Sequence, residues 1–225
     1  MCGRLAVTLP HDAMARLFAA TPANDLPPVP DFNLCPGQQI AIVASTEGQR
    51  RLRPMRWGFV PQWYKTPTDG PLLINARAET IAEKPAFRAA CRQRRGLIPA
   101  TGYYEWSAGP GGARLPWYIH RSDGAPIAFA AIWQDWEQDG QGISTCAIVT
   151  TRANDSLSAV HDRMPLSIEP RDWPLWLGEA GTGAAKLMLP APEGRFAFHR
   201  VSPEVNSNRA DGPQLIEPFT DADRV

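Results

Sequence analysis

The sequence has no Cys-x-x-Cys pair, although it contains four cysteines. Zinc ribbons hold their metal with such pairs, so a zinc ribbon is not expected. We also expect no other metal ion and no cofactor. The N-terminus lacks the apolar segment of a signal peptide, and no stretch approaches the ~20 apolar residues that cross a membrane. These absences predict a soluble intracellular protein with reduced thiols.

A net charge is also missing, because 23 Lys and Arg residues balance 23 Asp and Glu residues. A neutral chain does not by itself indicate a nucleic-acid binder. The charges are unevenly divided, however: residues 1–114 carry 14 basic and 8 acidic residues, whereas residues 115–225 carry 9 and 15. Lysine is scarce, and arginine pairs with phosphate through a planar fork. A GC-rich genome also favours arginine codons, so both explanations stay open.

Long helices are not expected, because the 23 prolines divide the chain into short segments. Short apolar or alternating runs predict strands, and their close spacing predicts an antiparallel sheet curled into a barrel or a sandwich. The length suits one large domain. The predicted strands cover residues 40–44, 51–57, 72–74, 97–99, 103–106, 117–120, 127–133 and 143–149.

Three short helices are predicted, over residues 10–20, 82–91 and 170–177. In the first of them, Met14, Leu17 and Phe18 fall on one face at i, i+3 and i+4, a spacing typical of a helix. The sequence of residues 21–30, TPANDLPPVP, predicts a loop. We expect a domain of residues 1–210, followed by a polar, loosely held C-terminal tail of residues 211–225.

The first chemical signal is the segment Met1-Cys2-Gly3-Arg4. Initiator methionine is normally removed before a small residue, which would leave Cys2 with a thiol and an α-amine on adjacent carbons. Their ordinary pKa values of ~8.5 and ~7.7–8.0 make both groups partly nucleophilic near neutral pH. Such a pair condenses with an aldehyde to an imine and then closes to a thiazolidine ring. A chance cysteine at position 2 is the alternative.

A second signal is the segment from Asn75 to Thr80, which follows a predicted strand at a place where a loop usually begins. The Asn75 carboxamide both donates and accepts, so it could orient an amine or a sugar hydroxyl. Arg77 could hold a phosphate. Asn is also a common turn residue, and on this segment alone the structural explanation is favoured.

Two further segments carry titratable side chains. Glu105 lies among aromatic residues in a predicted strand, where burial would raise its pKa and suit it for proton transfer; Trp106 could stack on a base. His161 is a candidate general acid–base residue, because the unperturbed pKa of histidine suits that work near neutral pH, and Arg163 could pair with phosphate. A solvent-facing Glu105 and a surface His161 are the alternatives.

Taken together, these segments resemble the SRAP family, named for "SOS response-associated peptidase", over nearly the whole chain. The order of the motifs makes the resemblance specific, although members often carry Arg-Cys where this chain has Arg95-Gly96. The matching segments are residues 1–4, 33–37, 56–58, 75–80, 97–106, 150–154, 161–165 and 201–206.

The resemblance implies an α+β single domain with a curled, barrel-like and mainly antiparallel sheet, flanked by short helices. It implies a monomer of the bacterial cytosol or nucleoid that acts on abasic sites in single-stranded DNA. Cys2, made N-terminal, would trap the sugar aldehyde as a thiazolidine crosslink that shields the strand from cleavage. Asn75 would position the amine of Cys2. Glu105 would shuttle protons, and His161 would assist opening of the sugar ring.

The DNA contacts implied by the resemblance are Arg4, Arg77 and Arg163 on phosphates, with Trp106 as a stacking wedge beside the lesion. Three alternatives stay open. A cysteine peptidase or autoprotease would use the same Cys2 nucleophile to remove Met1. A lyase would cut the DNA strand if the reaction stopped at the imine. A non-catalytic single-stranded DNA-binding module would need the arginines and Trp106 but not Cys2.

Overall fold

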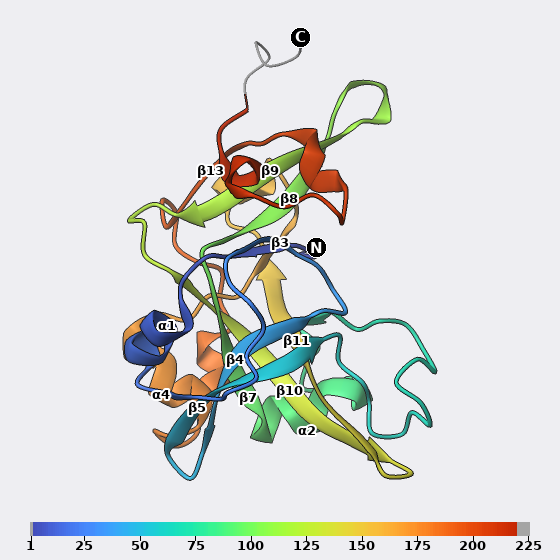
Figure 1. The fold of residues 1–225 in the computed structure, drawn as a ribbon. Coiled ribbons are helices and arrows are strands. Elements are labelled where there is room, and N and C mark those ends of the chain that lie inside the picture. Colours follow the sequence, from blue (N-terminus) through green and yellow to red (C-terminus); the bar gives the residue numbers. More distant parts are fainter. Residues whose placement is uncertain (1, 220–225) are drawn as a thin grey trace.

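The computed structural model describes residues 2–219, and its strands form two sheets (Figure 1). The larger sheet closes into a barrel, because β11 pairs with β5 and so completes a ring of strands. The β11–β5 pair is parallel, and every other neighbouring pair of this ring is antiparallel. The barrel strands, in ring order, are β5 (Gln49–Trp57), β4 (Gln39–Thr46), β7 (Arg95–Ala100), β10 (Ile127–Gln138) and β11 (Gln141–Arg152).

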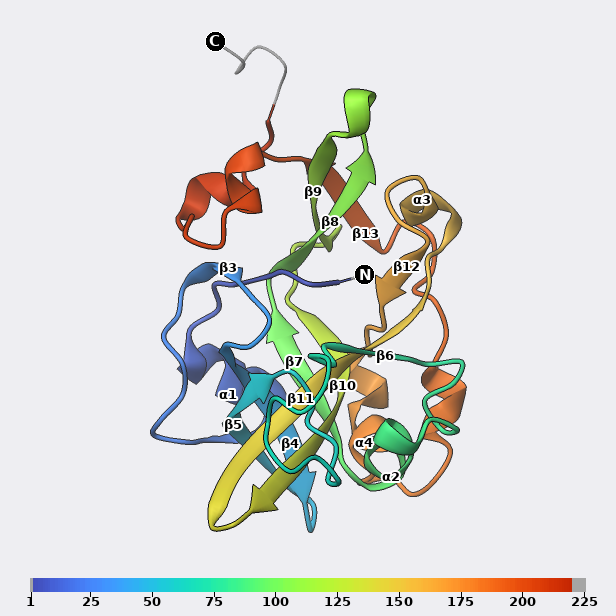
Figure 2. The same ribbon diagram turned by 90° about the vertical axis from the view of Figure 1, so that its right-hand side faces the viewer.

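The second sheet is five-stranded and open, and it stacks above the barrel in both views (Figures 1 and 2). Only Thr101 separates β7 of the barrel from β8 of the open sheet, so the chain passes directly from one sheet to the other. The strands of this sheet, in order, are β13 (Phe196–Arg200), β9 (Arg114–Arg121), β8 (Gly102–Ala108), β1 (Leu5–Val7) and β3 (Asp31–Leu34).

Short elements complete the fold. The strand β6 pairs in parallel with β11, β12 pairs with the end of β11, and β2 pairs with β5. Their bounds are β2 (Thr21–Pro22), β6 (Asn75–Arg77) and β12 (Arg163–Pro165). The helices are α1 (His11–Phe18), α2 (Pro85–Gln93), α3 (Asp155–Ser158) and α4 (Trp173–Leu177), and the 3-10 turns are η1 (Pro110–Gly112), η2 (Pro170–Asp172), η3 (Ala184–Leu187), η4 (Pro203–Asn206) and η5 (Pro213–Ile216).

Aromatic side chains join the helices to the barrel. Phe18 of α1 stacks on Trp173 of α4 with ring centroids 4.2 Å apart, and the Trp176 indole donates to the carbonyl of Gly96 in β7. The helix predicted from the spacing of Met14, Leu17 and Phe18 is present as α1. Met14 and Phe18 of this helix are buried, whereas Leu17 is 43% exposed.

The predicted α+β fold with a barrel-like sheet and short helices is confirmed. Asn75, however, begins strand β6 rather than a loop, because β11 offers it a parallel partner at Ile148. At the C-terminal end, Leu215 of η5 is fully buried; residues 220–225 lie outside the described residues, and the domain boundary at residue 210 stays a prediction. In the described part of the chain no helix has the length and apolar character needed to cross a membrane.

Candidate active site

Cys2 lies where the N-terminal segment passes between β8 and the barrel, and it is only 1% exposed. The Asn75 side-chain amide donates to the Cys2 carbonyl over 2.8 Å. The β6–β11 pairing therefore positions Asn75 against a residue that lies 73 positions earlier in the chain. The Asn75 Oδ1 atom is buried and accepts no hydrogen bond within residues 2–219, which leaves one acceptor at the site for an incoming donor.

Glu105 comes from β8, whose side chains alternate between two faces of the open sheet. We call the face that carries Tyr103 and Glu105 the front face, and the face that carries Tyr104 and Trp106 the reverse face. Glu105 is 3% exposed. Burial raises the pKa of its carboxyl, and the positive charge of the His161 ring, when that ring is protonated, partly offsets that rise. A carboxyl with a raised pKa can hold a proton and release it, as general acid catalysis requires.

Cys2, Tyr103 and Glu105 share this buried front-face environment. Burial raises the pKa of the Cys2 thiol, and the Glu105 carboxylate raises it further. Burial also raises the pKa of the Tyr103 hydroxyl, and the nearby Cys2 and Glu105 raise it further. The thiol is therefore neutral at pH 7, so its proton must leave when the sulfur forms a bond.

His161 lies in the loop between α3 and β12. Its Nδ1 atom is 3.0 Å from the Arg163 backbone N–H and 3.0 Å from the Asp162 carboxylate. The backbone N–H can only donate, so in the neutral form of the ring Nδ1 accepts and the proton is on Nε2. The Asp162 carboxylate is 86% exposed, where an ion pair with the protonated ring is screened by water.

The predicted phosphate-binding arginines fall into two groups. Arg4 is buried, and its guanidinium donates to the side chains of Asn33 and Asn208 and to the Val205 carbonyl. Arg163 makes a bidentate pair with Glu79, at 2.8 and 2.9 Å. Within the described chain, by contrast, the Arg77 side chain is exposed and enters no hydrogen bond or ion pair. The structure thus leaves Arg77 freer to bind phosphate than Arg4 or Arg163.

Trp106 lines a cavity of about 410 Å³ together with Gly3, Arg4, Arg114 and Asn206. Its indole N–H donates to the Asn206 side-chain oxygen over 2.6 Å, which fixes the ring plane. The Arg114 guanidinium lies 5.2 Å from the ring centroid, within the range of a cation–π contact. Arg114 and Asn206 therefore extend the set of residues expected from the sequence.

Comparisons with known proteins agree with this geometry. Residues 1–208 match the sequence model of the family described as SOS response associated peptidase (SRAP). The chain belongs to the SRAP family. It is 32% identical to the abasic site processing protein YoqW of Bacillus subtilis, with 96% of this chain and 99% of YoqW covered. It is 31% identical to the abasic site processing protein YedK of Escherichia coli, with 97% and 100% covered.

The same fold is seen in the crystal structure of a protein from Bacteroides thetaiotaomicron. That protein is 22% identical to this chain, with a TM-score of 0.84 over 97% of this chain and 100% of the other. At this level of identity the likeness concerns the fold.

Several SRAP segments hold the candidate site rather than enter it. Asn33 binds the Arg4 guanidinium, and Asn154 caps α3 just before His161. The Trp57 indole donates to the Ile74 carbonyl, next to Asn75. Gly58 follows Trp57 with φ 146°, and a Cβ there would lie 2.4 Å from a Leu72 side-chain atom. These contacts explain why residues distant from the chemistry belong to the recognisable pattern.

The structure brings Cys2, Asn75, Glu105 and His161 into one region, as Figure 2 shows for the N-terminal segment beside β8, β6 and β12. Sequence reasoning missed Tyr103 as a neighbour of Cys2, although strand alternation places it on the face of Glu105. No sequence signal could have found the contacts of Asn206 with Trp106, because 100 residues separate them. In residues 2–219 no group of three or more His, Cys, Asp or Glu residues could hold a metal ion.

Proposed function

We propose that this protein processes abasic sites in single-stranded DNA by forming a covalent crosslink through Cys2. The observation that carries the proposal is the buried Cys2, held at its carbonyl by Asn75 and placed beside the Glu105 carboxyl. Relatives that match over almost the whole chain are named abasic site processing proteins. The chemistry requires a mature chain that begins at Cys2, so that a free amine stands next to the thiol.

The reaction begins on the open-chain aldehyde of the abasic sugar. The Cys2 amine adds to the aldehyde carbon, and loss of one water molecule gives an imine. The sulfur then adds to the imine carbon, while the thiol proton passes to the imine nitrogen and closes a thiazolidine ring. The sum is aldehyde plus aminothiol giving thiazolidine plus water. No bond of the DNA backbone breaks, and the capped carbon no longer supports β-elimination.

Glu105 and His161 have distinct roles in this scheme. Glu105, with its raised pKa, donates the proton that lets hydroxide leave as water during imine formation. His161 presents Nε2–H toward the sugar and assists ring opening at the sugar oxygen. Asn75 aligns Cys2 through its carbonyl, and its unused Oδ1 accepts from the Cys2 amine.

The DNA backbone would pass along the exposed cations around this centre. Arg77 and Arg114 are available for phosphates, and the Trp106 ring lies next to Gly3 in the 410 Å³ cavity, where a flanking base can stack. Arg4 adds a positive charge there while it holds Asn33, whereas the charge of Arg163 is compensated by Glu79. Single strands suit this arrangement better than a duplex, because stacking on Trp106 needs an unpaired base. We expect a monomer.

The deciding experiment is intact mass spectrometry after mixing the protein with a single-stranded oligonucleotide that contains one abasic site. We expect a heat-stable adduct whose mass is the sum of protein and DNA less one water, from protein that begins at Cys2. Cys2→Ala should give none. The matched control is Cys91→Ala, which removes a buried thiol of helix α2 and should keep the adduct.

Other outcomes would redirect the assignment. An adduct that persists in Cys2→Ala would refute the thiazolidine chemistry. A cut oligonucleotide without an adduct would indicate a lyase. No reaction from protein that truly begins at Cys2 would favour the peptidase or the plain DNA-binding function.

A further inference from the structure

A second pocket lies on the reverse face of the open sheet, away from Glu105. It has a volume of about 270 Å³ and opens between β9, β13 and the segment of residues 216–218. Its polar lining comes from Tyr118 and His120 on β9 and His199 on β13. The pairing of His199 with Tyr118 and of His120 with Gly102 places these side chains on one face.

The three rings form a compact group. The His120 and His199 centroids are 5.7 Å apart, and the Tyr118 ring is 5.6 Å from His120 and 5.7 Å from His199. The Tyr118 ring covers Gly102, where an added Cβ would come within 2.4 Å of it. Tyr118 is 4% exposed, and its buried hydroxyl has no hydrogen-bond partner in the part of the chain that the structure describes. A buried hydroxyl without a partner is costly, which makes an additional polar occupant favourable.

Backbone carbonyls set the tautomers of both histidines. His120 Nδ1 lies 3.0 Å from the Arg121 carbonyl, and His199 Nε2 lies 2.8 Å from the Ile216 carbonyl. A carbonyl only accepts, so each of these nitrogens carries the proton. In the neutral rings the lone pairs are therefore on His120 Nε2 and His199 Nδ1. Histidines that bind metal ions almost always donate the other ring N–H in this way.

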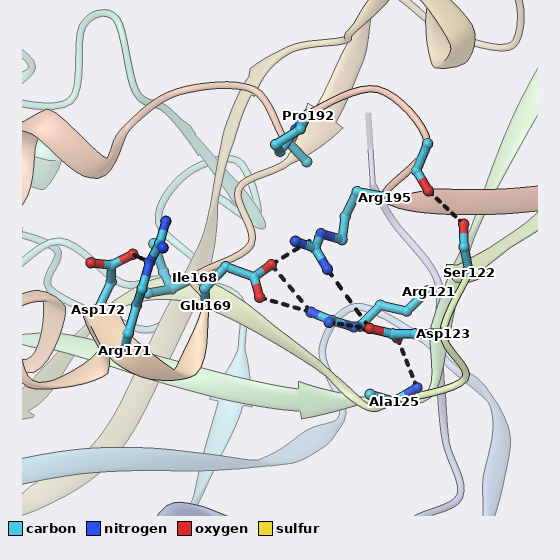
Figure 3. A network of polar contacts seen from close by, with 12 residues as sticks. Arg121, Ser122, Asp123, Ala125, Ile168, Glu169, Arg171, Asp172, Pro192 and Arg195 are labelled. Carbon is cyan, nitrogen blue, oxygen red and sulfur yellow. Dashed lines mark hydrogen bonds and ion pairs between the residues drawn. The ribbon is translucent and has the colours of Figure 1, made fainter.

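The charges around the pocket favour a cation over an anion. Arg121, the one arginine in the lining, binds Asp123 at 2.6 Å and Glu169 at 3.2 Å. Arg195 forms ion pairs with the same two carboxylates, so the charges of the two arginines and the two carboxylates cancel (Figure 3). Glu217 adds a carboxylate to the pocket lining. An incoming cation thus meets no uncompensated positive charge.

We propose that this pocket binds one divalent transition-metal ion, with His120 Nε2 and His199 Nδ1 as ligands and Tyr118 hydrogen-bonded to a water molecule on the ion. Imidazole suits Zn²⁺, Ni²⁺ and Cu²⁺. Two rings that share an ion at Zn–N distances of about 2.0–2.1 Å have centroids roughly 5–6 Å apart, which matches the separation here. Water completes the coordination, since only two histidines are present. The inference does not depend on the DNA chemistry.

Zinc titration calorimetry on a Cys2→Ala background tests the site, because that background removes the thiol of the candidate active site. We expect one Zn²⁺ per chain, a rise in melting temperature on adding Zn²⁺, and at least tenfold weaker binding in His120→Ala and His199→Gln. His199→Gln keeps an N–H donor for the Ile216 carbonyl while removing the ring lone pair, so its fold is preserved. His11→Ala, in helix α1, is the matched control and should bind Zn²⁺ normally.

Two results would overturn the proposal. One is that the Cys2→Ala protein shows neither a heat of Zn²⁺ binding nor a rise in melting temperature at Zn²⁺ concentrations up to about 1 mM. At that concentration even a weak site, with a binding free energy of about −4 kcal/mol, would be half filled. The other is undiminished Zn²⁺ binding by the folded His120→Ala/His199→Gln double variant. Crosslinking of abasic DNA by His199→Gln with Cys2 intact is measured in parallel and should be unchanged, so failure of the metal site and failure of the DNA chemistry are distinguishable.

Discussion

The two faces of strand β8 show how one strand serves two purposes. On the front face, Glu105 is buried beside Cys2, with His161 close enough to affect its pKa. On the reverse face, Tyr104 packs against Tyr118 with centroids 5.3 Å apart, and its hydroxyl donates to the Phe32 carbonyl over 2.7 Å. The front face therefore gathers reactive groups from distant segments, whereas the reverse face near Tyr104 is filled by rings.

The difference shows that burial alone does not mark a functional group. Tyr104 and Glu105 are buried to a similar degree. Tyr104 lies among aromatic rings and donates to a backbone carbonyl, whereas the carboxyl of Glu105 lies among other titratable groups, which is typical of catalytic sites. What surrounds a buried polar side chain separates the two cases.

Among the variants that compare the two faces, Glu105→Gln should have the largest effect. It keeps the size of the side chain but removes its acidic proton, so crosslinking should slow by about 10²–10⁴-fold. Time courses of adduct formation with abasic oligonucleotide measure this rate. Glu137→Gln, at the exposed end of β10, is the control and should react at the parent rate. Equal rates for Glu105→Gln and the parent would remove Glu105 from the mechanism.

Replacing Arg114 by Ala tests whether DNA reaches the reverse face next to Trp106. Loss of one phosphate contact should lower the slope of log affinity against log salt by about 0.7 for a single strand. Fluorescence anisotropy at several salt concentrations measures the slope. Arg171→Ala, at an 86% exposed position in η2, should leave it unchanged. If Arg114→Ala and Arg171→Ala give the same slope, the DNA does not contact Arg114.

Two tyrosine variants sharpen the comparison within the reverse face itself. Tyr104→Phe removes a hydrogen bond to the Phe32 carbonyl and should lower the free energy of unfolding by about 0.5–1.5 kcal/mol. Tyr118→Phe removes a hydroxyl without a partner in the described residues and should leave stability unchanged or slightly higher in metal-free buffer. Urea unfolding measures both. A larger loss for Tyr118→Phe would show that its hydroxyl has a stabilising partner in solution.

The pH dependence of stability gives the smallest effect. The folded state raises the pKa of Glu105 above its ordinary value of ~4.3, so the folded protein binds this proton more tightly than the unfolded chain does. The contribution of Glu105 to the free energy of unfolding is therefore lost as the pH rises from about 4 through the raised pKa. The parent should lose stability relative to Glu105→Gln over that range in urea unfolding. A constant difference between the two would show that the pKa of Glu105 is not raised.

Much of the fold could be predicted from local patterns. The alternation in residues 51–57 and the apolar run in residues 143–149 correspond to β5 and β11. Pro54 suggested an edge strand, and in the structure β5 pairs with β2 at Arg51 and Leu52 and with β11 only from Arg56 onward. Pro54 thus occupies the gap between two partners, where its missing N–H costs nothing.

The strands β1, β3 and β13 could not be predicted in the same way, because they are short and their partners are distant. Leu5 pairs with Leu34 on one side and with Tyr103 on the other. The placement of Cys2 next to Glu105 follows from those pairings and not from any local pattern. The identities of Cys2, Asn75, Glu105 and His161 were available from the sequence and its family resemblance, whereas the engagement of Arg4 by Asn33 and Asn208 was not.

The position of β1 between β3 and β8 also sets an order of events during synthesis. A ribosome adds about 5–20 residues per second, so roughly 5–20 s separate the appearance of Leu5 from that of its partner Tyr103. Cys2 cannot be enclosed before then. During this interval the thiol is open to solvent, and the removal of Met1 that the proposed chemistry requires would fall within it. The fold encloses the thiol only once β8 has been made.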